Sequence, residues 1–289
     1  MSHLIHLKRR IKSIKTTEKI THAMRLIAMS LYSKLDKQYK PLQYHVEKLE
    51  ELFKDLRKQN PNWKNATFLP EDPFNQNPLY IVISATKGFC GGLNNNMFKY
   101  IDYKLHIEEH QSPTFITIGK KATSFVDTKF NNIMTSYNDL NSNNFADIAG
   151  KLAHLIIEAP STYSSVIVYS SVFKNFFNQK PVAHEILPLG DSKGEEAQQQ
   201  EVSETSEAIE PIWEQSKIDT INFVAKKYLD ARLIDVLFQA LISEYASRFV
   251  AMDNATTNAE SYLETLTLQF NKLRQALITR EVSELSASL

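Results

Sequence analysis

This chain has few glycines for a globular protein. The 289 residues include only 7 glycines, roughly a third of the usual ~7% share. Gly88, Gly91 and Gly92 stand within five positions of one another. Neither glycine nor proline follows Pro211, and the first 60 residues contain only Pro41. Because these two residues end helices, the sequence predicts long helices at both ends and a punctuated domain between them.

Cysteine and long apolar runs are also scarce. The single cysteine, Cys90, excludes an internal disulfide and a zinc cluster of cysteines, and it suits a reducing compartment. No apolar run reaches the ~18 residues of a membrane-spanning helix, and the charged N-terminus predicts no secretory signal. Eight histidines lie without metal-ligand spacing, so no metal site is predicted. Hydrophobic residues make up 43% of the chain, which is enough for a folded core.

The C-terminal stretch carries an apolar seam. Its members are Ile234, Leu237, Leu241, Tyr245, Phe249, Met252, Ala255, Ala259, Leu263, Leu266, Phe270, Leu273 and Leu277. Steps of three and four residues are typical of a coiled coil. The stretch 217–286 is therefore predicted to be one helix, about 105 Å long at 1.5 Å per residue.

The N-terminal stretch has a similar seam. We assign it to Ile20, Met24, Ile27, Leu31, Leu35, Leu42, Val46, Leu49, Phe53 and Leu56. An earlier segment with the same spacing, Leu4 to Ile14, is offset from it by a polar run. Pro41 is predicted to kink or restart this helix. The simplest arrangement packs the two terminal helices antiparallel within one chain, with Met24 and Ile27 against residues 248–259; a homodimeric coiled coil is the rival.

The middle alternates predicted strands with predicted helices. Strands are expected at 79–84, 114–118, 132–136, 165–170 and 182–187, and helices at 97–110, 122–127 and 144–157. This alternation indicates an α/β domain with a mainly parallel, Rossmann-like sheet. The predicted division is an N-terminal coiled-coil helix (1–60), a linker (61–78), the central α/β domain (79–188), an acidic loop (189–211) and a C-terminal coiled-coil helix (212–289).

Charge is uneven although it sums to zero. Residues 1–40 hold ten Lys and Arg against two Asp and Glu, whereas residues 190–210 hold seven acidic residues and one Lys. The basic end lacks the interleaved aromatic residues of a base-stacking surface, so a solvated or partner-facing helix is favoured over nucleic-acid or membrane binding. The acidic block is typical of a solvated loop.

Two groups of residues invite a chemical interpretation. The loop 87–94, called the glycine loop below, follows a strand and precedes a helix, but it lacks the Lys-Ser/Thr of a phosphate loop. We therefore expect a structural turn that binds no cofactor, with Cys90 as a packed thiol. The isolated chain is accordingly expected neither to hydrolyse ATP nor to bind it tightly. The second group is polar and lies near the C-terminus: Arg274, Gln275, Thr279 and Glu281. Ordinary helix-surface polarity and partner contact are both compatible with it.

Four segments together resemble one family, the gamma subunits of F-type ATP synthases. They are residues 9–28 (RRIKSIKTTEKITHAMRLIA), 88–94 (GFCGGLN), 248–259 (RFVAMDNATTNA) and 270–285 (FNKLRQALITREVSEL). The matches follow the family's order and span the chain.

The resemblance implies a non-catalytic rotor shaft. Its coiled coil would turn within three alpha and three beta subunits, and its base would sit on the membrane c-ring with the epsilon subunit. It implies a peripheral protein on the cytoplasmic face of a bacterial plasma membrane, rather than the mitochondrial matrix, with no nucleic acid and no cofactor. The resemblance also assigns residues. Contacts with the alpha/beta ring fall to Met24, Arg248, Arg274, Gln275, Thr279 and Glu281. Contacts with the membrane ring or the small subunit fall to Cys90, Trp213, Glu214 and Gln215.

Two other classes remain as alternatives. A coiled-coil scaffold that pairs with itself predicts a homodimer and no use for the glycine loop. A small-molecule enzyme built on the α/β domain predicts a polar cleft with perturbed acids or bases.

Overall fold

The computed structural model describes residues 2–69, 77–108, 113–158, 163–189 and 216–287. The chain forms two compact units. The coiled-coil unit comprises Met1–Ser33, Phe89–Gly91 and Tyr245–Leu289, and the sheet unit comprises Lys34–Gly88 and Gly92–Glu244. The five consecutive segments predicted from the sequence stay a prediction. The two compact units group residues that are close in space, so they do not test where such segments begin and end.

Two long helices occupy the ends of the chain, which confirms the prediction. Helix α1 spans Ser2–Gln59 and helix α5 spans Lys217–Ala287. Pro41 lies inside α1, so of the two predicted alternatives, a kink or a restart, the restart is wrong. Proline removes one backbone hydrogen bond from a helix interior, and the burial of Val46, Phe53 and Leu56 beyond it gives α1 packing that helps it continue.

The sheet unit contains one five-stranded sheet. Its strands are β1 (Pro78–Ile83), β2 (Thr114–Ile118), β3 (Ile133–Tyr137), β4 (Ser165–Asn175) and β5 (Asn178–Leu187). Their order in space is β3-β2-β1-β4-β5. Every pairing is parallel except that of β4 with β5, which are joined as an antiparallel hairpin. The predicted, mainly parallel α/β domain is therefore confirmed.

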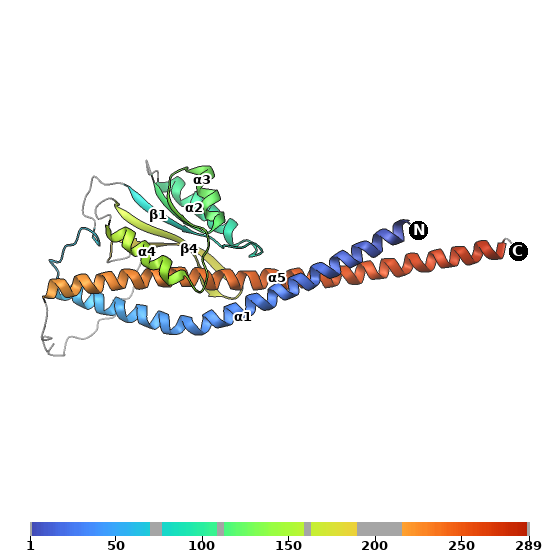
Figure 1. Cartoon of the computed structure of the whole chain (residues 1–289), viewed down its shortest axis with the longest axis horizontal. Helices are drawn as coiled ribbons and strands as arrows, with labels where there is room; N and C mark the ends of the chain where they lie inside the picture. Colours follow the sequence, from blue (N-terminus) through green and yellow to red (C-terminus); the bar gives the residue numbers. More distant parts are fainter. Residues whose placement is uncertain (1, 70–76, 109–112, 159–162, 190–215, 288–289) are drawn as a thin grey trace. The chain divides into compact units, whose positions relative to one another are not determined.

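Helices cover both faces of this sheet. Helices α2 (Leu93–Glu108) and α3 (Lys120–Lys129) connect β1 to β2 and β2 to β3. Helix α4 (Phe145–Glu158) connects β3 back to β4, in the opposite direction along the sheet. Because parallel crossovers are right-handed, this reversal places α4 on the other face from α2 and α3, as Figure 1 shows. The order reverses between β1 and β4, at a topological switch point.

The core on the α2 and α3 face is largely aromatic. Tyr80, Phe115 and Tyr169, from three neighbouring strands, are almost wholly buried and pack with Met97 and Ile101 of α2. The ring centroid of Tyr80 lies 5.6 Å from those of both Phe115 and Tyr169. This packing fixes the strands whose carboxyl ends surround the switch point.

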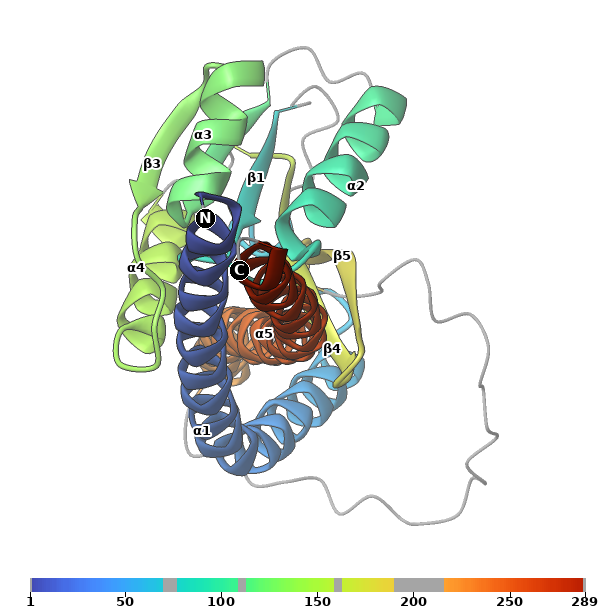
Figure 2. The same cartoon turned by 90° about the vertical axis from the view of Figure 1, so that its right-hand side faces the viewer.

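In the coiled-coil unit, the first turns of α1 lie beside the last third of α5 in both views (Figures 1 and 2). On α5 the predicted seam is confirmed, since Met252 and Leu266 are buried and the seam residues between and beyond them are half-buried. The helices pair within one chain, so burial of this seam requires no second copy.

The predicted seam of α1 is wrong near its middle. Ile20 and Ile27 are 55% and 60% exposed, while Thr21 and Ala28 are buried. The observed seam continues the heptad of Leu7 through positions 14, 21, 28 and 35 without an offset. At the two inner positions 21 and 28 the residues are the small Thr21 and Ala28, and the larger Ile20 and Ile27 beside them face outward.

Candidate functional site

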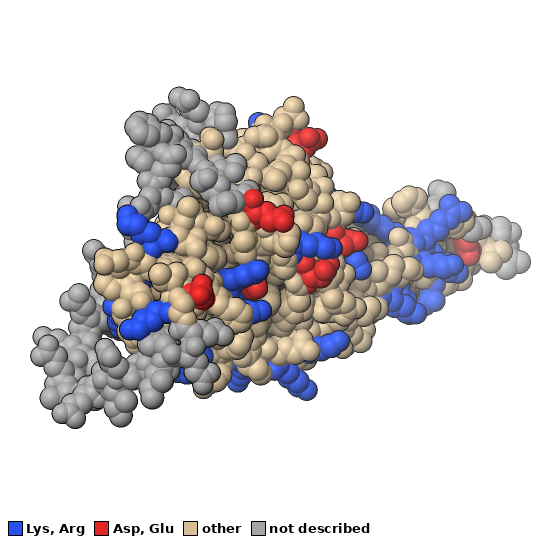
Figure 3. Space-filling view, turned by 60° about the vertical axis from the view of Figure 1, so that its left-hand side comes forward, with Lys and Arg blue, Asp and Glu red and all other residues tan. Residues whose placement is uncertain are grey.

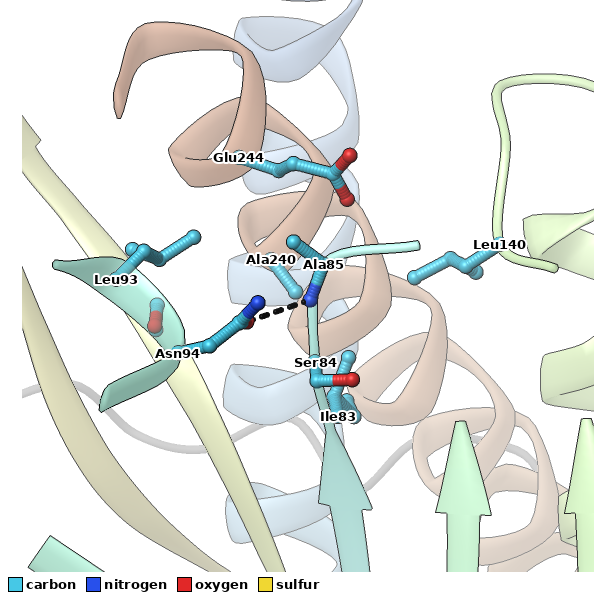
Figure 4. A pocket seen from close by; sticks show the side chains of 9 residues that line it. Ile83, Ser84, Ala85, Leu93, Asn94, Leu140, Ala240 and Glu244 are labelled. Atoms are coloured by element: carbon cyan, nitrogen blue, oxygen red, sulfur yellow. Dashed lines mark hydrogen bonds between the residues drawn. The ribbon is translucent and has the colours of Figure 1, made fainter. Parts of the chain in front are cut away.

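The glycine loop begins at the carboxyl end of β1, beside a small cavity of the sheet unit. Asn94 and Glu244 are among the side chains that line it (Figure 4). The Ala85 N–H donates to Asn94 Oδ1 at 3.0 Å, and the Thr86 N–H donates to Glu244 Oε2 at 3.3 Å. The cavity has room for about one water molecule, and Glu244 is only 5% exposed. A buried carboxylate repels phosphate, so this edge is poorly suited to a nucleotide.

The remainder of the loop is attached to α5 within the coiled-coil unit. Ser247 Oγ donates a 2.8 Å hydrogen bond to the carbonyl of Cys90. Cys90 is buried, so it is packed as the sequence predicted, and its role toward a small subunit stays a prediction. Phe89 adopts a positive φ of 63° and is 66% exposed. That conformation is unusual for a bulky residue, and no signal in the sequence predicts it.

Met24 and Arg248, two of the expected ring contacts, are not freely exposed. Met24 is half-buried. Arg248 is 6% exposed, and its guanidinium lies 5.4 Å from the centroid of the Tyr245 ring. Stacking on an aromatic face is a favourable environment for arginine. In this structure Arg248 therefore has an internal environment, and a partner contact by it remains a prediction.

The side chains of the other four expected ring contacts are exposed to solvent. Arg274, Gln275, Thr279 and Glu281 are all exposed, and α5 runs past the start of α1 here (Figure 1). The Thr279 hydroxyl donates to the Gln275 carbonyl at 3.0 Å, which is an ordinary bond within a helix. Every residue from Ile278 to Ala287 is exposed, so beyond Leu277 each face of this helix is open to a partner.

Apolar side chains at the same end were missed by the sequence analysis. Ile278 is 52% exposed and Val282 is 59% exposed. They are four residues apart and share one face of the helix. Together with Ile20 and Ile27 on α1, they expose apolar surface that nothing in the described chain covers.

Basic side chains gather on the same unit. Lys and Arg cluster on the narrow coiled coil in Figure 3. The first half of α1 and the last part of α5 both supply exposed basic residues: Lys8, Arg9, Arg10, Lys12, Lys15 and Lys19 on α1, and Lys272, Arg274 and Arg280 on α5. Such a surface favours an acidic partner through long-range attraction.

The remaining assigned residues, Trp213, Glu214 and Gln215, lie outside the described residues, as does most of the acidic loop. Within the described ranges, no group of three His, Cys, Asp or Glu side chains could hold a metal ion. No described helix is long and apolar enough to span a membrane.

Two titratable groups of the sheet unit lie in unfavourable surroundings. His184 Nε2 and Asp235 Oδ1 are buried and lack hydrogen-bond partners within the described ranges. Burial, with a smaller effect of the Arg232 charge, lowers the pKa of His184 to about 4. Burial raises the pKa of Asp235, although a hydrogen bond from Gln239 opposes the shift. The two groups belong to β5 and α5 and do not form an acid–base pair.

Comparison with known proteins gives a consistent result. A family model described as ATP synthase matches residues 3–289. The ATP synthase gamma chain of Pelotomaculum thermopropionicum is 30% identical over 287 residues, covering 99% of this chain and 97% of the relative. The ATP synthase gamma chain of a Synechococcus species is 30% identical over 312 residues, covering 99% and 98%.

Solved structures share the fold. A chain from the OSCP/F1/c-ring structure of Euglena gracilis mitochondrial ATP synthase superposes with a TM-score of 0.65 at 17% identity, covering 99% of this chain and 93% of that one. A chain from the central stalk and c-ring of Tetrahymena thermophila mitochondrial ATP synthase gives 0.58 at 19% identity, covering 82% and 99%.

Proposed function

The chain belongs to the family of ATP synthase gamma chains, and we propose that it is the shaft that couples proton movement through a membrane c-ring to ATP synthesis or hydrolysis. It is a non-catalytic subunit of the rotary central stalk. The partners that we propose are three alpha subunits, three beta subunits, an epsilon subunit and the c-ring, at the cytoplasmic face of a bacterial membrane.

One observation carries most weight for a shaft. The end of α5 projects as a single helix that exposes polar residues all round and an apolar pair, Ile278 and Val282. An isolated helix in water gains little from its own propensity, so this end is expected to lie within a partner. A ring that surrounds the helix would contact every face of it.

The coupling mechanism follows from asymmetry. A shaft with different faces touches each of three identical beta subunits differently at any angle. Differential contact is what shifts an equilibrium between conformational states. Rotation then moves each site through its states in turn, and the shaft forms and breaks no covalent bond.

The test is purification of the tagged chain from membranes of its own organism. The proposal expects alpha and beta subunits in the eluate, with ATPase activity that is absent from the chain alone. A homodimer without them would support the self-pairing scaffold instead. Micromolar ATP binding by the isolated chain, measured calorimetrically, would support the small-molecule enzyme.

A further inference from the structure

Two polar pairs join α1 and α5 in the middle of the coiled-coil unit. Arg25 Nη1 donates a 2.7 Å hydrogen bond to Asp253 Oδ1, and this ion pair is partly shielded from solvent. One turn earlier on α1, the hydroxyls of Thr21 and Thr256 lie 2.9 Å apart. Both threonines are buried, at 9% and 2% exposed.

The apolar residues around these pairs do little to fix the register of α1 along α5. Ala28 is wholly buried, and Ala255 and Ala259 are half-buried. Small side chains allow the two helices to approach closely. They provide few interlocking side chains that would oppose the sliding of one helix along the other. Directional polar pairs in a seam select one register at some cost in stability. A slip of one turn, about 5.4 Å, would break both pairs.

His22 restricts the geometry of the arginine further. Its Nδ1 lies 3.0 Å from Arg25 Nη2. Because guanidinium nitrogens only donate, this imidazole nitrogen must accept. One planar guanidinium is thus held by a residue of its own helix and by Asp253 of the other helix. A lysine could donate to both acceptors only from a single nitrogen, so it would not hold them in one rigid plane.

We propose that Arg25 is a positioning residue that acts through Asp253 to fix the register of α1 against α5, so that torque is transmitted along the shaft without slip. The transmission of torque rests on the proposed function, whereas the register itself is a property of the chain alone. Partly exposed ion pairs contribute little to stability. The pair therefore matters for alignment more than for folding.

The register can be measured in the full-length chain. Spin labels at the exposed positions 30 and 257, introduced as Ser30→Cys and Thr257→Cys with Cys90→Ser, report the distance between the helices by pulsed electron resonance. We expect one narrow distance distribution. Arg25→Met and Asp253→Asn should each add a second population displaced by about one helical turn. The exchange of charges in Arg25→Asp with Asp253→Arg should restore the single population.

A matched control removes an exposed ion pair elsewhere. Lys151→Met breaks the 2.7 Å pair with Asp147 on α4 and should leave the distribution unchanged. A single population in both Arg25→Met and Asp253→Asn would overturn the register lock.

The functional consequence is tested in the assembled complex in vesicles. We expect Arg25→Met to lower the number of protons pumped per ATP hydrolysed, while hydrolysis continues and the charge exchange restores pumping. Split distances with unchanged pumping would overturn the positioning role. Failure of the unmodified chain to enter any complex with alpha and beta subunits would instead overturn the proposed function, and the distance measurement would stand by itself.

Discussion

Gly119 lies so close to Ser84 that a β-carbon added to it would come within 2.6 Å of the Ser84 carbonyl oxygen. Its φ is +94°, a conformation that L side chains rarely adopt. The Ser84 hydroxyl accepts a hydrogen bond from the Ala122 N–H at 2.9 Å. The start of α3 is therefore attached to the end of β1 through a contact that only glycine permits.

Gly119→Ala is expected to lower the free energy of unfolding by roughly 2–4 kcal/mol, because the clash involves backbone and the φ is strained. Gly150 provides a matched control, since a β-carbon there would meet nothing within 4 Å. Gly150→Ala in α4 should raise stability by about 0.5–1 kcal/mol. Urea denaturation of the two variants measures both. Equal effects would show that the contact at Gly119 is not restrictive.

Substitutions at neighbouring positions of α1 distinguish the observed seam from the one predicted by hydrophobicity. Ala28→Leu should destabilise the coiled-coil unit by about 1–3 kcal/mol through overpacking. Ile27→Ala should change stability by no more than about 0.5 kcal/mol, because the side chain is exposed. Thermal unfolding followed by circular dichroism tests this pair of variants. A larger loss of stability in Ile27→Ala than in Ala28→Leu would instead support the seam predicted through Ile27.

The two terminal seams show why the sequence predicted one helix better than the other. On α5 the apolar residues of the predicted seam are all buried or half-buried, so their periodicity locates the contact face. On α1 the buried positions include Thr21 and Ala28, whereas Ile20 and Ile27 face outward. A helix that has a second partner surface carries two apolar stripes. Periodicity alone does not show which stripe meets the other helix.

The candidate site was predictable only in part, for a similar reason. The exposed polar residues at the end of α5 stand out in the sequence because several polar types fall within two turns. The burial of Arg248 and Glu244, the positive φ of Phe89 and the pairing of Arg25 with Asp253 depend on long-range contacts. No local pattern encodes which distant residue will face a given side chain.

Stability of the sheet unit should depend on pH through His184. The folded chain holds the pKa of this imidazole at about 4, below its ordinary value of 6.5. Between these values the unfolded chain binds more protons, so stability falls as the pH falls from about 6.5 to about 4. The loss should approach about 3 kcal/mol. His184→Gln should remove this dependence, which urea unfolding at a series of pH values measures. The exposed His154→Gln should retain it; identical profiles for both variants would contradict the assignment.

Asp235 has the opposite influence. Its raised pKa means that the folded chain binds the proton more tightly, so stability is lost as the pH rises above the unfolded value of about 3.8 through the raised value. Asp235→Asn removes the buried charge at pH 7 and keeps an oxygen that can accept from Gln239, which now bonds Oδ2 at 2.8 Å. Stability at pH 7 should therefore rise. The exposed Asp147→Asn is the control, and an equal gain there would indicate a general charge effect.

The final prediction concerns the projecting end of α5. Gln275 and Thr279 are four residues apart and share one face, whereas Arg274 and Glu281 are seven apart and share another. A shaft that turns within a ring needs contacts on several faces, strong enough to hold each pause and weak enough to release. A hydrogen bond with a charged partner contributes roughly 1.5–3 kcal/mol, which suits a reversible contact.

We therefore expect Arg274→Ala with Gln275→Ala to lower ATP turnover of the assembled complex by about tenfold, while the complex still assembles. Both side chains are exposed, so their loss should leave the chain folded. Lys120→Ala with Lys121→Ala, two exposed residues of α3, is the matched control and should retain turnover. Subunit composition by mass spectrometry must be normal before rates are compared. If turnover and torque are then unchanged, these two residues do not hold the shaft at its pauses, and Thr279, Glu281 and the apolar pair Ile278 and Val282 remain as candidate contacts at this end.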